Sequence, residues 1–262
     1  MADVSTEGGV ASGAMHPGIR TIGVADLREA LARGVDDFLA IPTQLVFLGI
    51  IYPIIGFAAV QVASGRDLLP LVYPLIAGLS LLGPVLAVGL YELSRRREQG
   101  LPVSALNAFD VLRSPNIASI AMLGLVLFAI FVVWLATARG IYDATIGHAP
   151  ASPGALVQEA LDTSAGWRLI LFGNLAGFVF AVVTLALSVV SFPMLVDRNV
   201  GPLVAAQTSV RAVVANPLIM ALWGLVVAGL LALGCLPFFI GLAVVMPVLG
   251  HATWHLYRRV VE

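Results

Sequence analysis

Long runs of apolar residues, separated by short polar segments, dominate the pattern of this sequence. A helix needs about 20 consecutive apolar residues to cross the hydrocarbon core of a bilayer. Four runs have the length for one such helix each, at residues 41–63, 68–93, 116–138 and 167–196. The last run, 217–257, is roughly twice the length of one span and contains Leu236-Pro237 near its middle, where the chain can turn. We therefore predict six transmembrane helices.

The composition agrees with this pattern. Apolar residues make up 60% of the chain and charged residues only 11%, whereas soluble domains carry about 25% charged residues. The net charge of −1 gives no reason to expect a nucleic-acid partner. Cys235 is the only cysteine, which excludes a disulfide framework and a thiolate metal cluster. The expected partners are the lipid bilayer and other membrane-protein subunits, and no cofactor is expected.

The arginines predict the orientation of the spans. Arginine accumulates on the cytoplasmic side of membrane proteins. Three arginines fall in odd-numbered connections, namely Arg66, Arg139 and Arg168. The other eleven of the 14 lie in even-numbered connections and near the two ends: Arg20, Arg28, Arg33, Arg95, Arg96, Arg97, Arg113, Arg198, Arg211, Arg258 and Arg259. We expect a multi-pass protein of a bacterial inner (cytoplasmic) membrane with both termini in the cytoplasm.

A threefold repeat runs through the chain. Short amphipathic segments at 26–39, 103–112 and 204–214 each end just before a proline, at Pro42, Pro115 and Pro217. Proline suits the first position of a helix because its missing N–H would have no partner there. The pattern predicts an all-α, polytopic membrane helical bundle of six transmembrane helices in three repeated hairpins, each preceded by a short amphipathic interfacial helix.

The domain organisation follows from the same pattern. Residues 1–22 are small and polar and are predicted to form a disordered cytoplasmic tail. Residues 23–262 are expected to form a single six-span membrane domain, with repeats at about 24–100, 101–200 and 201–262.

Four motifs carry a resemblance to a known family. They are LGPVLAVGLYELSRRREQG (82–100), SFPMLVDR (191–198), TSVRAVVANPLIMALW (208–223) and GHATWHLYR (250–258). Together they resemble the uncharacterised bacterial membrane family called domain of unknown function 2189, over nearly the whole chain after the tail. The resemblance implies an integral membrane architecture and leaves the activity unassigned.

Some members of that family carry a loose label of cytochrome c oxidase subunit. A haem-copper oxidase core needs several membrane histidines as metal ligands. This chain has four histidines, of which His16 lies in the tail, His148 in an external loop, and His251 and His255 on one helix. One helix cannot place two axial ligands on opposite sides of a haem, so the sequence argues against a catalytic oxidase subunit.

Candidate functional residues gather at the cytoplasmic ends of the second, fourth and sixth predicted spans. The cluster comprises Glu92, Asp197, Arg198, His251, Trp254 and His255. Ionisable residues inside spans are costly and therefore mark candidate sites. His251 and His255 are four residues apart and share one helix face. Asp197 occupies the repeat position equivalent to His251, which suggests that the two side chains meet.

Three interpretations of this cluster stay open. The first is a structural network, with Asp197 paired to Arg198 or a histidine, Glu92 paired to Arg95 or Arg96, and Trp254 and Tyr257 in the aromatic belt of the membrane interface. The second is a divalent-metal site formed by His251, His255 and the carboxylate of Asp197 or Glu92. The third is a relay for protons or solutes at a cytoplasmic vestibule.

These interpretations lead to two hypotheses for function. Polar residues are sparse near the middle of the spans, which argues against secondary transport. The sequence shows no nucleophile–base pair, phosphate-binding loop or cofactor motif, so we expect no enzyme activity. The leading hypothesis is a non-enzymatic scaffold or accessory factor of a membrane complex. The alternative is a protein that handles protons, a metal or a small solute through the Asp/His cluster.

Overall fold

The computed structural model describes residues 17–41, 43, 66–150, 152–236 and 239–262. Within these ranges the chain forms α-helices and short 3-10 helices and no strand, which confirms the all-α prediction. One isolated β-bridge pairs Ile19 with Val261. The first predicted span, 41–63, lies outside the described residues except for Ile41 and Thr43.

Four helical segments in the described part of the chain are long and apolar enough to cross a membrane: Leu69–Glu98, Ile117–Thr145, Ser164–Asp197 and Pro217–Cys235. They correspond to the second, third, fourth and fifth predicted spans. The sixth predicted span corresponds to α12 (Leu242–Val260), which is not one of the four and which carries two histidines and two arginines in its second half. The six-span count and the three equivalent hairpins therefore stay predictions.

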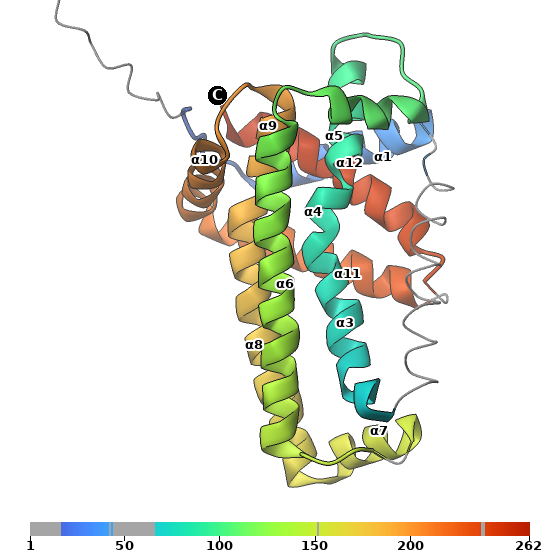
Figure 1. Cartoon of the computed structure of the whole chain (residues 1–262). Coiled ribbons are helices and arrows are strands. Elements are labelled where there is room, and N and C mark those ends of the chain that lie inside the picture. The colour runs from blue at the N-terminus through green and yellow to red at the C-terminus, as the bar shows by residue number, and fades with distance from the viewer. Residues whose placement is uncertain (1–16, 42, 44–65, 151, 237–238) are drawn as a thin grey trace, which may run out of the picture.

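The second predicted span is assembled from consecutive short helices. They are η1 (Arg66–Leu71), α3 (Val72–Leu79), η2 (Ser80–Leu82), α4 (Gly83–Leu86) and α5 (Val88–Glu98). Pro84 lies in the first turn of α4, where its lack of an N–H costs no intrahelical hydrogen bond. In Figure 1 these helices follow one another along one side of the bundle.

The third and fourth predicted spans form the longest helix pair, α6 (Ile117–Thr145) against α8 (Ser164–Ser188), and α9 (Ser191–Asp197) prolongs the second of them. Trp134 of α6 is buried, donates its indole N–H to the carbonyl of Pro74 at 2.8 Å, and packs on Phe180 of α8 with ring centroids 5.6 Å apart. Trp134 thus joins three elements. The short helix α7 (Pro153–Asp162) lies across the far end of the pair (Figure 1).

The three predicted amphipathic segments are helical. They are α1 (Val24–Ala40), η3 (Ala105–Arg113) and α10 (Pro202–Ala215), and they lie toward the end of the bundle where the C-terminus is found (Figure 1). The main hydrophobic core lies where α1, α5, α9 and α12 meet. Its most deeply buried side chains include Tyr91, Leu93, Phe192, Met194, Leu195, Trp254 and Leu256. This end of the bundle is called the cap below.

Away from the cap, the spans expose large apolar side chains. Leu125 and Phe128 on α6, and Leu171, Leu175 and Phe178 on α8, are each exposed. Only 22% of the most apolar stretch of α6, and 17% of that of α11 (Pro217–Cys235), is buried against the rest of the described chain. An apolar surface of this extent suits hydrocarbon and not water. The molecule is therefore an integral membrane protein with several apolar helices.

Residues 20–22, at the end of the predicted tail, contact the start of α11. The backbone N–H of Ile22 donates to the side-chain oxygen of Asn216 at 2.9 Å, and the Asn216 amide donates to the carbonyl of Arg20 at 3.0 Å. Asn216 and Ile22 are both buried. A buried amide needs its hydrogen bonds satisfied, and the segment before α1 satisfies them here. Residues 1–16 lie outside the described residues.

Candidate functional site

A buried network of polar side chains joins α1, α5 and α12 inside the cap. The carboxylate of Asp37 accepts a hydrogen bond from the Ser94 hydroxyl at 2.6 Å and lies 2.8 Å from Nε2 of His255. Arg97 forms an ion pair with the other oxygen of Asp37. Ser94 Oγ also lies 2.8 Å from Nδ1 of His251. We call these five residues the Asp37 network.

The proton positions in the network follow from its chemistry. A carboxylate only accepts hydrogen bonds, so the single hydroxyl proton of Ser94 points to Asp37. Nδ1 of His251 must then be the donor to Ser94 Oγ. The other ring nitrogen, Nε2, is buried and has no hydrogen-bond partner in the described structure. At one end of the network, the Nε2 atom of His251 lacks a hydrogen-bond partner within the described residues. At the other end, the side chain of Arg97 is partly exposed to solvent.

The sequence of α1 explains why Asp37 reaches this position. Leu27, Ala30, Gly34 and Asp37 are the buried residues of α1 and recur at helical spacing, so they form its inner face. A Cβ atom at Gly34 would come within 2.7 Å of the backbone nitrogen of Ala252 in α12. Glycine at this position therefore permits the close approach of α1 and α12 that carries Asp37 to the histidines.

Hydrogen bonding keeps Asp37 ionised. Burial raises the pKa of its carboxyl group, but the hydrogen bonds from His255, Ser94 and Arg97 outweigh burial and lower the pKa to about 2. The side chain is only 5% exposed, so solvent screens these contacts little. A stable negative charge inside the cap is thus held by three donors from two other helices.

This lowered pKa predicts how stability depends on pH. Because the folded pKa lies below the ordinary value of 3.8, Asp37 stabilises the fold above pH 3.8, and this contribution is lost as the pH falls toward 2. The unfolding free energies of the wild type and of Asp37→Asn should converge by on the order of 2 kcal/mol from about pH 5 to about pH 2. Chemical unfolding in detergent at several pH values measures both. A difference that stays constant over this range contradicts the assignment.

A second set of contacts surrounds Asp197. Its carboxylate accepts a hydrogen bond from the Tyr257 hydroxyl at 2.6 Å and lies 3.6 Å from Arg198 and 3.4 Å from Arg258. Glu92 accepts two hydrogen bonds from Arg95, each at 2.8 Å. The predicted pairs of Asp197 with Arg198 and of Glu92 with Arg95 are both present.

Two expectations for this cluster are wrong. Asp197 bonds Tyr257 and not His251; the acid beside the histidines is Asp37, because α1 packs directly along α12. Trp254 and Tyr257 are not belt aromatics, since they are 0% and 1% exposed within the core. The Trp254 indole N–H donates to the exposed Glu98 at 3.1 Å, at the surface of the cap.

The predicted metal site of His251, His255 and Asp197 does not assemble. In the described ranges, no three histidine, cysteine, aspartate or glutamate side chains lie in positions to hold a metal ion. The two histidines instead bond a serine hydroxyl and a carboxylate. The structure thus divides the predicted cluster into two networks, one around Asp37 and one around Asp197.

Sequence reasoning missed Asp37, Ser94 and Arg97. A signal for Asp37 was present, because it continues the apolar stripe of Leu27, Ala30 and Gly34. An acid at a core-facing position requires a buried partner. Ser94 and Arg97 lie among the charged residues that end α5 and carry no comparable pattern.

Comparison with known proteins gives one family match. The sequence profile of a family described as "Predicted integral membrane protein (DUF2189)" matches residues 72–197. The matched range contains Glu92, Ser94 and Asp197, whereas Asp37, His251 and His255 lie outside it. Searches of curated proteins and of solved structures give no significant match. The resemblance is thereby confirmed over residues 72–197, which are similar to the DUF2189 family of predicted integral membrane proteins, whereas the motifs at 208–223 and 250–258 lie outside the matched range.

Proposed function

We propose that this protein is a non-enzymatic scaffold or accessory factor of a membrane complex, in a bacterial inner membrane with both termini in the cytoplasm. The observation that carries the proposal is a contrast within the molecule. The charged groups of the cap bond mainly to one another, while three of the four described spans, Leu69–Glu98, Ile117–Thr145 and Pro217–Cys235, have 17–24% of their most apolar stretches buried against the rest of the described chain.

The polar cap supports a structural role. The Asp37 carboxylate is occupied by Ser94, His255 and Arg97, and that of Asp197 by Tyr257 and two arginines. Acceptors that are already occupied have little capacity for a substrate or an ion. Such networks serve best to fix α1 and α12 against the ends of the spans.

The uncovered spans support a partner in the membrane. Helices associate in bilayers by close packing of their surfaces, since lipid tails are as apolar as the side chains. On α6 and α11, the large exposed residues include Leu125, Phe128, Leu218 and Leu225. These faces are available to lipid or to the helices of another subunit.

Site-directed photo-cross-linking in native membranes tests the proposal. A photoreactive amino acid would be placed in turn at Leu125, Phe178, Leu218 and Leu225, which are all exposed. A scaffold predicts that one protein is cross-linked reproducibly from one of these faces and not from the others, with buried Leu127 as the control position. Cross-links to lipid alone from every position, or a stoichiometric metal or haem in the purified protein, would contradict the scaffold role.

One observation favours a second candidate function, a proton relay. His251, Ser94, Asp37 and His255 form a continuous chain of hydrogen bonds from a buried ring nitrogen toward the edge of the cap. Carboxylates and histidines in such chains carry protons in membrane proteins. In vesicles with an internal pH dye, a relay predicts proton flux under a potassium diffusion potential and loss of this flux in Ser94→Ala. Equal rates in protein-free vesicles exclude the relay.

A further inference from the structure

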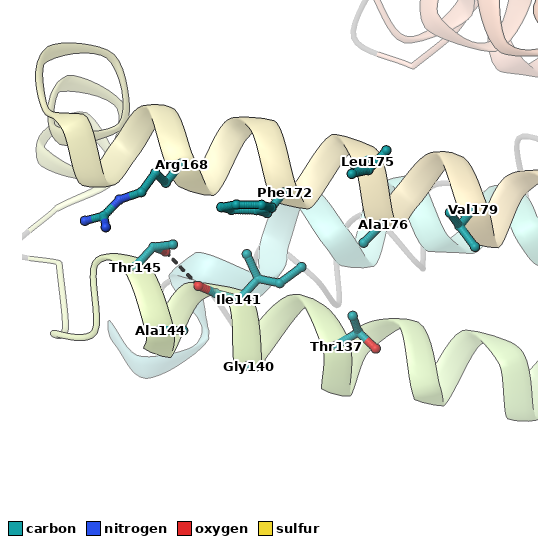
Figure 2. Close-up of a pocket in the computed structure, with 10 residues that line it drawn as sticks. All are labelled: Thr137, Gly140, Ile141, Ala144, Thr145, Arg168, Phe172, Leu175, Ala176 and Val179. Atoms are coloured by element: carbon teal, nitrogen blue, oxygen red, sulfur yellow. Dashed lines mark hydrogen bonds between the residues drawn. The ribbon is translucent and has the colours of Figure 1, made fainter.

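A groove lies between α6 and α8, at the end of the bundle away from the cap. Its volume is about 590 Å³. Ile141 of α6 and Phe172, Leu175 and Val179 of α8 line its length, as Figure 2 shows. The groove is hollow because small residues line α6: a Cβ atom at Gly140 would meet nothing within 4 Å.

One cation lies at the mouth of this apolar groove. Arg168, near the start of α8, is exposed and lines its outer end (Figure 2). Arg168 makes no ion pair or hydrogen bond with any residue that the structure describes. Two acids at this end of the bundle are already engaged, Asp143 by Arg139 and Glu159 by His148. Within the described residues, the donors of the Arg168 guanidinium group are therefore available to another molecule.

The neighbouring residues place Arg168 at the depth of the lipid headgroups. Trp167 is 59% exposed at the start of α8, and tryptophan concentrates at the boundary between membrane and water. On α7, which lies across this end of the bundle (Figure 1), Val157 and Leu161 are more than half exposed. Apolar residues on a short helix at this depth are typical of a segment that lies in the interface.

We propose that the groove binds one anionic phospholipid. Arg168 holds the headgroup phosphate through charge-assisted hydrogen bonds, and an acyl chain lies along Ile141, Phe172 and Val179. Since the Arg168 charge is not neutralised by an acid within the described residues, a headgroup with net negative charge fits better than a zwitterionic one. The proposal concerns lipid and is independent of the scaffold role.

Native mass spectrometry of the detergent-purified protein tests the site. The protein would be titrated with dioleoyl phosphatidylglycerol and, separately, with dioleoyl phosphatidylcholine. We expect the first phosphatidylglycerol to bind more tightly than phosphatidylcholine, and Arg168→Gln to weaken it about fivefold. Gly140→Leu, which fills the groove, should weaken the binding of both lipids.

Two control variants make the test specific. Arg211→Gln removes an exposed arginine from α10, at the cap, and should leave binding unchanged. Gly173→Leu adds the same side chain to α8 at a position where a Cβ atom also meets nothing within 4 Å but which does not line the groove. Equal lipid binding in the wild type and Arg168→Gln, or equal losses in Arg168→Gln and Arg211→Gln, overturns the site and leaves only non-specific surrounding lipid.

Discussion

Replacing Asp37 with alanine is expected to lower the free energy of unfolding by about 3 kcal/mol, because the removal of one member of a buried charged network leaves its partners uncompensated. The residues that lose a partner are His255, Ser94 and Arg97, which all contact this carboxylate. Because Ser94 and His255 are buried, water cannot readily take over the hydrogen bonds that they make to Asp37. Chemical or thermal unfolding of the purified protein in detergent measures the loss.

The neighbouring acid provides a matched control. Asp36 is exposed on the outer face of α1, one residue away from Asp37. Asp36→Ala removes the same carboxylate from the same helix and should change stability by less than about 0.5 kcal/mol. If both variants lose similar stability, the effect belongs to the helical propensity of α1 and the Asp37 network is not the cause.

Gly34→Val is expected to separate α1 from α12 and to destabilise the fold by about 1–3 kcal/mol, the usual effect of overpacking a tight contact. The new Cβ atom would lie 2.7 Å from the backbone nitrogen of Ala252 and 2.8 Å from the carbonyl oxygen of Val248. Backbone atoms cannot move aside by changing rotamer, so α1 itself must shift. Increased proteolysis of α1, together with a lowered unfolding temperature, is the expected measurement.

Gly229→Val is the control for this substitution. Gly229 lies inside α11, where a Cβ atom would meet nothing within 4 Å. The change therefore tests the effect of valine in a helix without the helix contact. An equal loss of stability in the two variants would show that the contact at Gly34 contributes nothing specific.

Four of the six predicted spans correspond to apolar helices in the described part of the chain, because the length that a span needs is set by the thickness of the bilayer. The helices Ile117–Thr145 and Ser164–Asp197 cover the predicted runs 116–138 and 167–196 closely. The three amphipathic segments were also recognisable, since helical periodicity and the following proline are local signals. The end of the last apolar run was harder to interpret, because α12 combines apolar residues with buried histidines.

The partners of the polar side chains could not be predicted in the same way. Both histidines and the pairs of Glu92 and Asp197 were recognised as candidates from their place in the spans. Which acid contacts the histidines depends on how α1 packs against α12. These two helices are far apart in the sequence, and no local sequence pattern indicates that they are in contact. The repeat alignment favoured Asp197 because it compared positions along equivalent helices, whereas the true contact comes from an interfacial helix.

The two ends of the described chain are fastened together by backbone pairing. Arg20 donates its N–H to the carbonyl of Val260, and Glu262 donates its N–H to the carbonyl of Gly18. This backbone pairing lies only a few residues beyond His255, near the end of α12. Removal of residues 18–20 or of residues 260–262 would break the same pairing, so a change in either segment is expected to loosen the last turn of α12.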